Sequence, residues 1–554
     1  MKATLLSSPS GKVNPKIVNF DALNTFLPPL HVARNQATDI RNLDSSKFPA
    51  LKVRNGKTVV GTTITTPNAL GQRNNQYIHS VDGTIWKYWN GSSYVQVRAK
   101  GQLLTVTLNA GGAGYSTNDI ITIVQGGGAL GSVRVATLGG GGAVATFTIE
   151  VVGNGYTVAN ALSTTVVPSG GTGCKLNITS VAALTSALGE FREFSTGTTK
   201  STIFSNATDR YSWDGTTVTS LTAAPSSRIF TTHKGRIYWA RDNDIVYSAL
   251  NLINDYSGAG SGTIDVTRAK GAIVALTEFA DRVWALTPYG LHGLYGTGPS
   301  NYELIDPEGN VGCASARSVI VSNDKLYWYA YDGIYEFDGA TPMIISDQSA
   351  NNGIIGGCTS FISGIKTTLR SLVASGSNGK YLYISIPYGA AATANNLTLV
   401  FDTKLRKWYV WDTGFINFVT VDNILYGVDT AGVLWDMSTT NTLDNATAIS
   451  WYFITGALSD GTPSSVETIN EVWLTFKLPV GSTLQVAYST ADEGATFTDS
   501  PTTFVASAST QTVRVKLPSS ALPRTNFRRW KIYGTGDCTI YHYEEKGRTR
   551  MNMR

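Results

Sequence analysis

The chain has 554 residues, enough for a large hydrophobic core and for two to four domains. Charged residues make up only 15%, below the roughly 25% of an average globular protein, and 42% are hydrophobic, so the chain is expected to fold. The formal net charge is only +5 over the whole chain, which argues against a protein that binds nucleic acid through its phosphates.

Export and membrane signals are absent from the sequence. Residues 1–20 contain no apolar core of the kind found in a signal peptide. No apolar run is long enough for a membrane-spanning helix, so no membrane-spanning segment is predicted. We therefore expect the protein to be made and assembled in a cytoplasm.

Strand patterns dominate from one end of the chain to the other. Period-two alternation and runs of β-branched or aromatic residues are separated by Gly, Asn and Asp turns. Helical periodicity is confined to two short stretches, 181–191 and 363–375. The predicted fold class is all-β.

Aromatic hairpins recur along this pattern, each with a hydrophobic strand, a tight turn and a second hydrophobic strand. They lie at 86–91, 211–215, 236–250, 282–296, 325–339, 380–389 with 399–412, and 424–437. Such irregular repetition is typical of a diverged β-propeller, although a stack of sandwiches would give similar strands. We predict an irregular propeller of five to eight blades, with N-terminal strands and a first blade in 1–100 and further blades in 182–440.

A Gly-rich segment, residues 101–181, interrupts the hairpins and is internally duplicated. Gly114-Tyr115 in its first half is matched by Gly155-Tyr156 in its second half. The segment carries strand-forming runs that a flexible linker would lack. It predicts a small two-lobed β module inserted at a blade edge, where exposed loops tolerate insertions.

The C-terminal part, residues 448–547, predicts a separate β-sandwich of about a hundred residues after a polar link at 438–448. Arg and Lys concentrate at 524–534 and again near the end of the chain. Residues 548–554 are interpreted as a basic tail, which either seeks anionic partners or is a solvated strand face with a frayed end.

Paired turn motifs suggest carboxylate chemistry at first sight, because Asp-Gly occurs twice in 332–339, and Asp82-Gly83 and Asn90-Gly91 flank another aromatic strand. Bulky aromatic residues occupy the positions where an EF-hand would need calcium ligands. Asp-Gly and Asn-Gly are also preferred in type I′ hairpin turns, whose two central residues take positive φ. We therefore expect structural turns, and expect Gly333→Val to damage folding or assembly by forcing a branched residue towards positive φ.

The sequence has no clear catalytic or metal-binding motif. The stretch 490–497 fits the "Asp box" of sialidase propellers, in which the Asp stabilises a turn and is not catalytic. There is no G-x-S-x-G motif and no C-x-x-C pair. No catalytic, cofactor-binding or metal-binding residue is assigned, no cofactor is predicted, and the protein is not expected to be an enzyme. The isolated residues considered were His31, His79, His233, His292, His542, Cys174, Cys313, Cys358 and Cys538.

Three stretches carry a resemblance to a known family. They are 42-NLDSSKFPALKVRNG-56, 224-APSSRIFTTHKGRIYWARDNDIVYSALN-251, and the pair 479-PVGSTLQVAYSTADEGATF-497 with 524-RTNFRRWKIYGTG-536. Together they resemble the β-propeller tail proteins of tailed bacteriophages, especially the nozzle or tail-tube component of short-tailed phages. The motifs are loose and structural, and the duplication at 101–181 departs from the pattern.

The resemblance implies a structural protein of the virion, located in the tail after synthesis and assembly in the host cytoplasm. It implies a hexameric ring of identical subunits below the portal and adaptor, with tail fibres as further neighbours, around the channel for genome exit. A conduit of this kind must let DNA pass without binding it, which suits the low charge. The alternatives are a cell-surface glycan-binding propeller, since exposed aromatic residues can stack on sugars, and a glycosidase.

Overall fold

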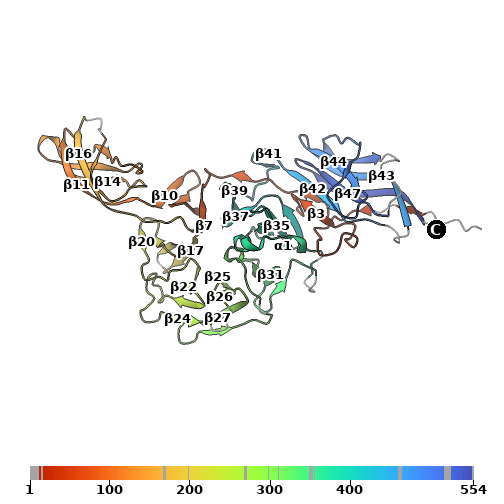
Figure 1. Ribbon diagram of the computed structural model, residues 1–554, viewed down its shortest axis with the longest axis horizontal. Coiled ribbons are helices and arrows are strands. Elements are labelled where there is room, and N and C mark those ends of the chain that lie inside the picture. The colour runs from red at the N-terminus through yellow and green to blue at the C-terminus, as the bar shows by residue number, and fades with distance from the viewer. Residues whose placement is uncertain are drawn as a thin grey trace, which may run out of the picture. The chain divides into compact units, whose positions relative to one another are not determined.

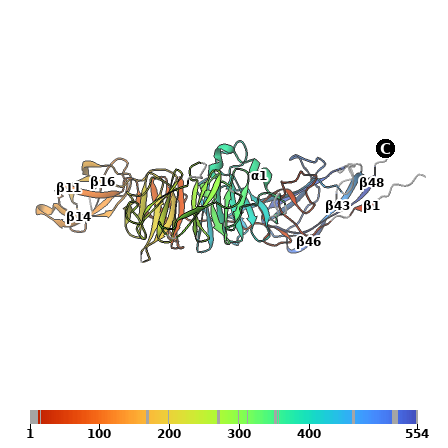
Figure 2. The same ribbon diagram turned by 90° about the horizontal axis from the view of Figure 1, so that it is seen from below.

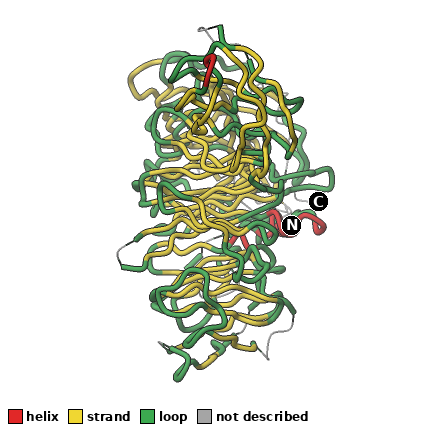
Figure 3. Tube along the Cα trace, turned by 90° about the vertical axis from the view of Figure 1, so that its left-hand side faces the viewer, coloured by secondary structure: helices red, strands yellow, loops and turns green. Residues whose placement is uncertain are grey.

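The computed structural model describes residues 11–13, 16–165, 170–197, 199–266, 271–296, 298–309, 311–348, 353–354, 356–459, 465–516 and 526–551. Strands account for most of the regular structure, as the yellow segments of Figure 3 show. The helical elements of these residues are short: η1 (Gly140–Gly142), η2 (Ala316–Ser318), α1 (Thr359–Ser363) and η3 (Thr367–Leu372). Within the described ranges, no helix has the length and apolar character needed to cross a membrane.

Four-stranded antiparallel sheets recur along the chain, and seven of them are found in the described residues. Six of these sheets are meanders of four consecutive strands and the seventh has the order β37-β38-β39-β6, and a four-stranded antiparallel sheet is the blade of a β-propeller. The all-β propeller prediction is therefore confirmed, with seven blades inside the expected range. Contacts divide the chain into two compact units, one of 63–265 with 297–300 and one of 1–62, 266–296 and 301–554.

The unit of residues 63–265 contains three blades (Figure 1). Side chains from the first two blades share one aromatic core, in which the rings of Trp86 and Phe204 lie 5.7 Å apart. The strands are β7 (Pro67–Arg73), β8 (Tyr77–Asp82), β9 (Ile85–Trp89) and β10 (Tyr94–Ala99); β17 (Glu190–Ser195), β18 (Lys200–Ser205), β19 (Arg210–Trp213) and β20 (Val218–Ser220); and β21 (Phe230–His233), β22 (Arg236–Arg241), β23 (Asp244–Tyr247) and β24 (Gly262–Asp265).

The inserted module follows the first of these blades and consists of two three-stranded sheets around a core of its own. One sheet has the order β11-β16-β15 and the other β12-β13-β14. The strands are β11 (Leu103–Ala113), β12 (Ile120–Thr122), β13 (Ser132–Leu138), β14 (Val144–Val151), β15 (Ala159–Ser163) and β16 (Thr172–Val181).

The duplicated tyrosines explain part of the module's glycine content. Both are buried, and each ring packs closely against a glycine of the other half. A Cβ built on Gly171 would lie 2.4 Å from the Tyr115 ring, and one on Gly131 would lie 2.5 Å from the Tyr156 ring. The Gly131 amide also donates to the Tyr156 hydroxyl at 2.9 Å. The two halves therefore share a packing motif as well as a sequence pattern.

The larger unit contains four blades. The fourth strand of its last blade is β6 (Thr58–Val59), which comes from the N-terminal part of the chain. Val59 pairs with Trp435 and Thr58 with Asp436 of β39. The other strands are β25 (Ala275–Phe279), β26 (Arg282–Thr287), β27 (Gly290–Tyr295) and β28 (Glu303–Ile305); β29 (Ile320–Ser322), β30 (Lys325–Tyr329), β31 (Ile334–Phe337) and β32 (Met343–Ile344); β33 (Ala374–Ser377), β34 (Tyr381–Ile386), β35 (Leu397–Asp402) and β36 (Lys407–Trp411); and β37 (Phe415–Val421), β38 (Ile424–Asp429) and β39 (Leu434–Asp436).

A β-sandwich of two sheets completes this unit. One sheet has the order β4-β5-β48-β43-β46, with β1 and β2 also paired to β48, and the other has the order β3-β42-β47-β44-β45. A hairpin of β40 (Leu443–Asp444) and β41 (Thr447–Ala448) precedes it. The strands are β1 (Gly11–Val13), β2 (Lys16–Ile17), β3 (Ala37–Arg41), β4 (Leu43–Asp44), β5 (Leu51–Val53), β42 (Ser450–Thr455), β43 (Ser465–Leu478), β44 (Thr483–Ser489), β45 (Thr498–Asp499), β46 (Ser507–Lys516), β47 (Arg529–Thr535) and β48 (Thr539–Met551).

The sandwich differs from its prediction at both ends of the chain. Five of its strands, β1 to β5, come from residues 11–53, and β1 lies beside β48 (Figure 2). Residues 548–551 of the predicted tail continue β48, where the backbone of Arg548 pairs with Thr468. Residues 552–554 lie outside the described residues. The predicted frayed end is therefore wrong up to Met551, because β43 pairs with β48 as far as Met551 and β1 pairs with it as far as Thr549.

The predicted helix at 181–191 is wrong, since the chain is extended between β16 and β17. Burial alternates there, with Ala182 and Leu184 buried and Ala183 exposed. The Ala183 carbonyl accepts a hydrogen bond from Arg98 Nε at 3.1 Å, so a side chain replaces the helical partner. The second predicted helix, 363–375, is only partly found. Residue 363 is the last residue of α1, and residues 367–372 form the short 3-10 helix η3.

The Asp-Gly motifs do form turns between strands, but type I′ geometry is wrong for Gly333, which is not in the left-handed region. Glycine is needed at position 333 because there is no room for a side chain. A Cβ there would lie 2.6 Å from Ile344 Cδ1 and 2.7 Å from Ser346 Oγ. Two-residue turns in which both residues take positive φ join the first two strands of four blades, one of which is the blade that contains Gly333. They are Lys234-Gly235, Ala280-Asp281, Asn323-Asp324 and Asp422-Asn423.

Gly333→Val is still expected to destabilise the protein, now through overpacking against Ile344 and Ser346. The expected loss is about 1–3 kcal/mol, measured by chemical denaturation. Gly126→Ala is the control, because a Cβ at Gly126 has no atom within 4 Å and its φ is ordinary. Equal stability of the Gly333→Val variant and the parent protein would contradict the packing argument.

Candidate interaction sites

The histidines and cysteines are dispersed through the fold and form no catalytic group together. Cys174, Cys313, Cys358 and Cys538 are buried free thiols. His79 lies in the aromatic core of the first two blades, where Trp86 Nε1 donates to His79 Nδ1 at 2.9 Å. Burial, and then the charge of Arg73, lower the pKa of His79 to about 3. His79 is therefore a neutral structural group at physiological pH.

His292 is the histidine that comes nearest to a catalytic arrangement. Its Nδ1 lies 2.7 Å from Asp306 Oδ1, the spacing of a base held by a carboxylate. The side chain of His292 is only 2% exposed, however, so a substrate cannot reach it without rearrangement. The pair supports the blade and gives no argument for an enzyme.

The loop of the "Asp box", residues 490–497, connects β44 to β45 in the sandwich. The Gly494 carbonyl accepts a hydrogen bond from Arg529 Nη1 at 2.8 Å, which fixes the loop to β47. Burial lowers the pKa of Arg529, although Glu493 and Asp492 oppose this. The loop is a hairpin connection, as its sequence predicted.

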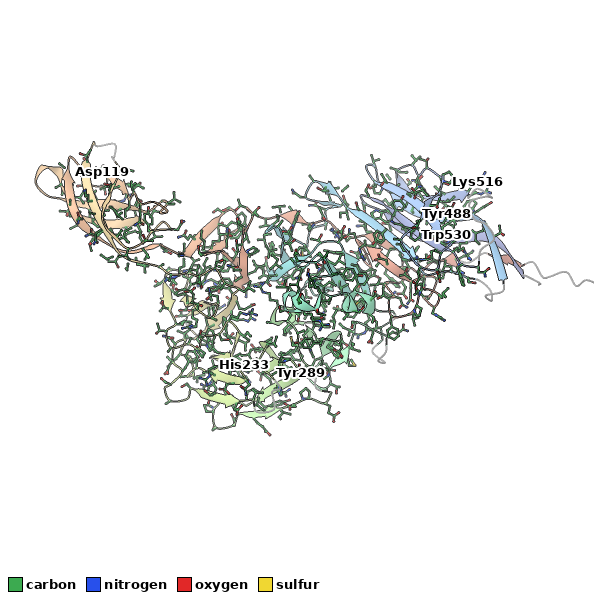
Figure 4. The ribbon with its side chains drawn as sticks, in the orientation of Figure 1. Asp119, His233, Tyr289, Tyr488, Lys516 and Trp530 are labelled. Atoms are coloured by element: carbon green, nitrogen blue, oxygen red, sulfur yellow. The ribbon has the colours of Figure 1, made fainter. Side chains whose placement is uncertain are left out.

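A buried ion network lies inside the sandwich around Glu545. Arg528 Nε donates to Glu545 Oε2 at 2.8 Å, and Arg34 Nη1 donates to the same oxygen at 3.2 Å. The other oxygen accepts from Trp530 Nε1 at 2.6 Å and from the Tyr543 hydroxyl at 2.7 Å; Trp530 is labelled in Figure 4. Burial alone would raise the pKa of Glu545, but the two arginines and the hydrogen bonds outweigh it and lower that pKa.

A second network anchors the stretch 42–56, which carries part of the family resemblance. Arg54 Nη1 and Nη2 donate to the two carboxylate oxygens of Asp444 at 2.8 and 2.7 Å, and Lys57 Nζ adds a contact of 2.8 Å. Arg54 Nε donates to Asn42 Oδ1 at 3.1 Å, and its guanidinium lies 4.6 Å from the Trp411 ring centroid. The guanidinium is thus held on several sides at once. This bidentate geometry is among the strongest ion-pair contacts in proteins.

A polar pocket of about 260 Å³ lies beside this network. Asp44 lines it, together with Asn378, Asn423 and Trp411. Burial raises the pKa of Asp44, although the Ser46 hydrogen bonds and the charges of two lysines partly offset the effect. The pocket therefore holds a carboxyl group whose ionised form is disfavoured by the fold.

The inserted module has an unusually uncharged surface. Residues 101–181 contain four charged side chains, Asp119, Arg134, Glu150 and Lys175. Two of them neutralise each other, since Arg134 Nε donates to Glu150 Oε2 at 2.9 Å. Large aliphatic side chains of the module are also exposed. These are Leu104, Ile120, Val124, Leu130, Leu138, Val151 and Val158.

Two exposed tyrosines mark another surface, on hairpin loops of neighbouring blades. Tyr289 follows β26 and Tyr331 follows β30, and their side chains line a pocket of about 360 Å³ together with Asp332 (Tyr289 is labelled in Figure 4). The two rings are nearly parallel, with centroids 6.4 Å apart and an interplanar angle of 24°. Sequence reasoning missed this site, because both tyrosines belong to the aromatic hairpin pattern and only the fold shows which rings are exposed.

Comparison with known proteins gives only distant likenesses. No protein family matches the chain, and no curated protein matches it. Among solved structures, the computationally designed protein Ika8 is 11% identical, covers 68% of this chain and 98% of its own, and has a TM-score of 0.35. BamB from Moraxella catarrhalis is 10% identical, with 69% and 97% coverage and a TM-score of 0.36. A streptogramin B lyase is 11% identical, with 60% and 96% coverage and a TM-score of 0.31.

Glu545→Gln should destabilise the protein by about 3–5 kcal/mol, because it leaves Arg528 and Arg34 without a buried counter-charge. Since the folded pKa of Glu545 is lowered, its contribution is present above the unfolded pKa and is lost as pH falls through the folded pKa. Denaturation at neutral and acid pH checks both statements. Glu471→Gln is the matched control: its ion pair with Arg514 is partly exposed and should contribute below about 1 kcal/mol. Equal losses for the two variants would contradict the network's role.

Asp44→Asn should have the opposite effect and stabilise the protein at neutral pH. Because the folded pKa of Asp44 is raised, its contribution is full below the unfolded pKa and is lost as pH rises through the folded pKa. An Asn can still accept the Ser46 amide hydrogen bond made by Asp44 at 2.8 Å. Melting curves across this pH range should show a stabilisation that disappears in acid. Asp214→Asn is the contrast, because amide hydrogen bonds from Thr217 and Thr216 lower the pKa of that exposed carboxyl.

Proposed function

We propose that the protein is a structural subunit of a bacteriophage tail, which forms a hexameric ring around the channel for genome exit. Its partners are further copies of itself, the portal and adaptor, and other tail proteins including fibres. The resemblance of 42–56, 224–251 and 479–497 to tail nozzle proteins suggests this role. The proposal needs a surface that can be buried between subunits, and the inserted module offers one.

The observation that carries the proposal is the combination of exposed aliphatic side chains and missing charge on the module. Interface cores are depleted of charged residues, because desolvating a charge costs free energy that pairing rarely recovers in full. Exposed apolar side chains gain free energy when another copy covers them, at roughly 25 cal/mol per Å². The surface of residues 101–181 therefore suits burial against a second protein better than contact with water.

Leu130 adds a separate argument from backbone geometry. Its φ is +63°, in the left-handed region that glycine and asparagine adopt most readily, and its side chain is 74% exposed. A leucine there costs roughly 1–2 kcal/mol in backbone strain and makes little contact within the subunit. Because Leu130 makes few contacts that could offset this strain within the subunit, we infer that a contact with another molecule offsets it. A neighbouring copy in the ring would supply this contact.

The charge distribution also fits a conduit for DNA. A strongly basic lining would hold phosphates and slow the genome, whereas this chain carries a net charge of only +5 over 554 residues. Part of its cationic charge is paired inside the fold, as at Arg54 and Arg528. DNA passage without specific binding is therefore part of the proposal.

The test is to determine the mass and shape of the purified protein, alone and mixed with the neighbouring tail proteins, by mass photometry and electron microscopy. Rings with an axial channel are expected. A protein that stays monomeric under all these conditions, or that catalyses glycan hydrolysis, would contradict the proposal.

Leu130→Asn separates an interface role from a folding role. Asn tolerates positive φ, so the thermal stability of the subunit should be unchanged or slightly higher, while the ring population should fall at least tenfold. Leu252→Asn is the matched control, since Leu252 is also exposed, at 49%, but lies outside the module. If the Leu130→Asn variant still forms intact rings, the module surface is not an interface between subunits.

A further inference from the structure

The pocket between the β26–β27 and β30–β31 loops is built by the backbone as well as by side chains. The first loop is a two-residue turn, since Thr287 pairs with Gly290, and the second turns between Tyr329 and Ile334. Gly312 lies against the first loop so closely that a Cβ on it would be 1.9 Å from the Pro288 carbonyl oxygen. Close backbone packing of Gly312 against the first loop therefore forms part of the pocket wall.

Two aromatic faces border this pocket and remain open to solvent. Tyr289 is 65% exposed and Tyr331 is 45% exposed, although large aromatic side chains are usually more buried than this. The nearly parallel rings form a surface of apolar faces with a hydroxyl on each. Such surfaces are common where a protein binds a partner that is apolar on one face and polar at its edges.

The charged groups at the pocket carry both signs. Asp332 lines the pocket, and its Oδ2 accepts a hydrogen bond from the Tyr335 hydroxyl at 2.8 Å. The Arg370 guanidinium lies 5.6 Å from the Tyr331 ring centroid, beside the residues that line the pocket, and it also interacts with Tyr329. A carboxylate can accept hydrogen bonds from hydroxyl groups, and a guanidinium can donate to them. Because one charge of each sign is present, neither an anion nor a cation is favoured overall.

We infer that this pocket binds a neutral hexopyranose unit of a polysaccharide. The C–H faces of the sugar ring would lie on Tyr289 and Tyr331, and its hydroxyl groups would bond to Asp332 and Arg370. A pocket of about 360 Å³ is within the size range of small-molecule sites. An acidic sugar would be attracted by Arg370 and repelled by Asp332, so it should gain nothing over a neutral one. A proline-rich peptide could stack on the tyrosines, but it offers few hydroxyl groups to use the two charged residues.

This inference goes beyond the proposed function and does not require it. In a tail subunit the site would bind glycans of a cell surface, while ring formation would depend on the separate surface of residues 101–181. Assembly and sugar binding are measured independently, so the failure of one leaves the other intact. The two proposals can therefore be distinguished by experiment.

The experiment is a binding titration of the full chain with neutral oligosaccharides of glucose, galactose and mannose, monitored by saturation-transfer NMR. Saturable binding of at least one of them is expected. Tyr289→Ala and Tyr331→Ala should each weaken it at least tenfold, and Arg370→Gln should weaken it less. Tyr541→Ala is the matched control, because Tyr541 is exposed at 39% on β48 of the sandwich.

Oligomers of uronic acids and a proline-rich peptide are titrated in parallel. Each of the following outcomes would overturn the inference: no binding of any neutral oligosaccharide, tighter binding of an acidic oligosaccharide or the peptide, or unchanged binding by the tyrosine variants. The melting temperature of each variant is measured first. These loops are exposed, so the tyrosine variants should melt within a few degrees of the parent.

Discussion

The clamp on Arg54 holds together the parts of the larger unit that lie far apart in the sequence. Residues just before it form β3 to β5 in the sandwich, and residues just after it form β6 of the last blade. Asp444, 390 positions away, accepts hydrogen bonds from Nη1 and Nη2 of Arg54. The ring of Trp411, at the end of β36, lies against the same guanidinium. Because buried ion pairs tolerate little displacement, the clamp fixes the register of the N-terminal segment in both structures. Blade closure and sandwich assembly therefore depend on one set of contacts.

Local patterns were sufficient to predict the class of fold. The aromatic hairpins at 236–250 and 282–296 became the central strands of blades, since alternating apolar residues pack on both faces of a sheet within a propeller. The Gly-Tyr duplication predicted a module, and each tyrosine of the duplication packs against glycine. These features depend on neighbours close in sequence, and a single sequence reports such neighbours well.

Features that depend on distant neighbours could not be predicted. The pairing of Gly11 with Thr549 leaves no local signature, so the N-terminal strands were not assigned to the sandwich. Turn geometry also depends on context: Ala280-Asp281 adopts positive φ at both positions, while Gly333 does not. The exposed surfaces were missed for the same reason. Tyr289 and Tyr327 look alike in a hairpin pattern, yet one is 65% exposed and the other 2%.

Charge is distributed unevenly, and this gives the two candidate surfaces different chemistry. Arg54, Arg528 and Glu545 are buried and paired where they join segments of the fold, so they are unavailable to partners. The module surface of 101–181 has few charges and exposed aliphatic groups, which favours a broad, dry contact with another protein. The tyrosine pocket keeps one carboxylate and one guanidinium beside two apolar faces, which favours a small polyhydroxylated ligand. A subunit that both assembles and binds glycans would need these two kinds of surface at separate places.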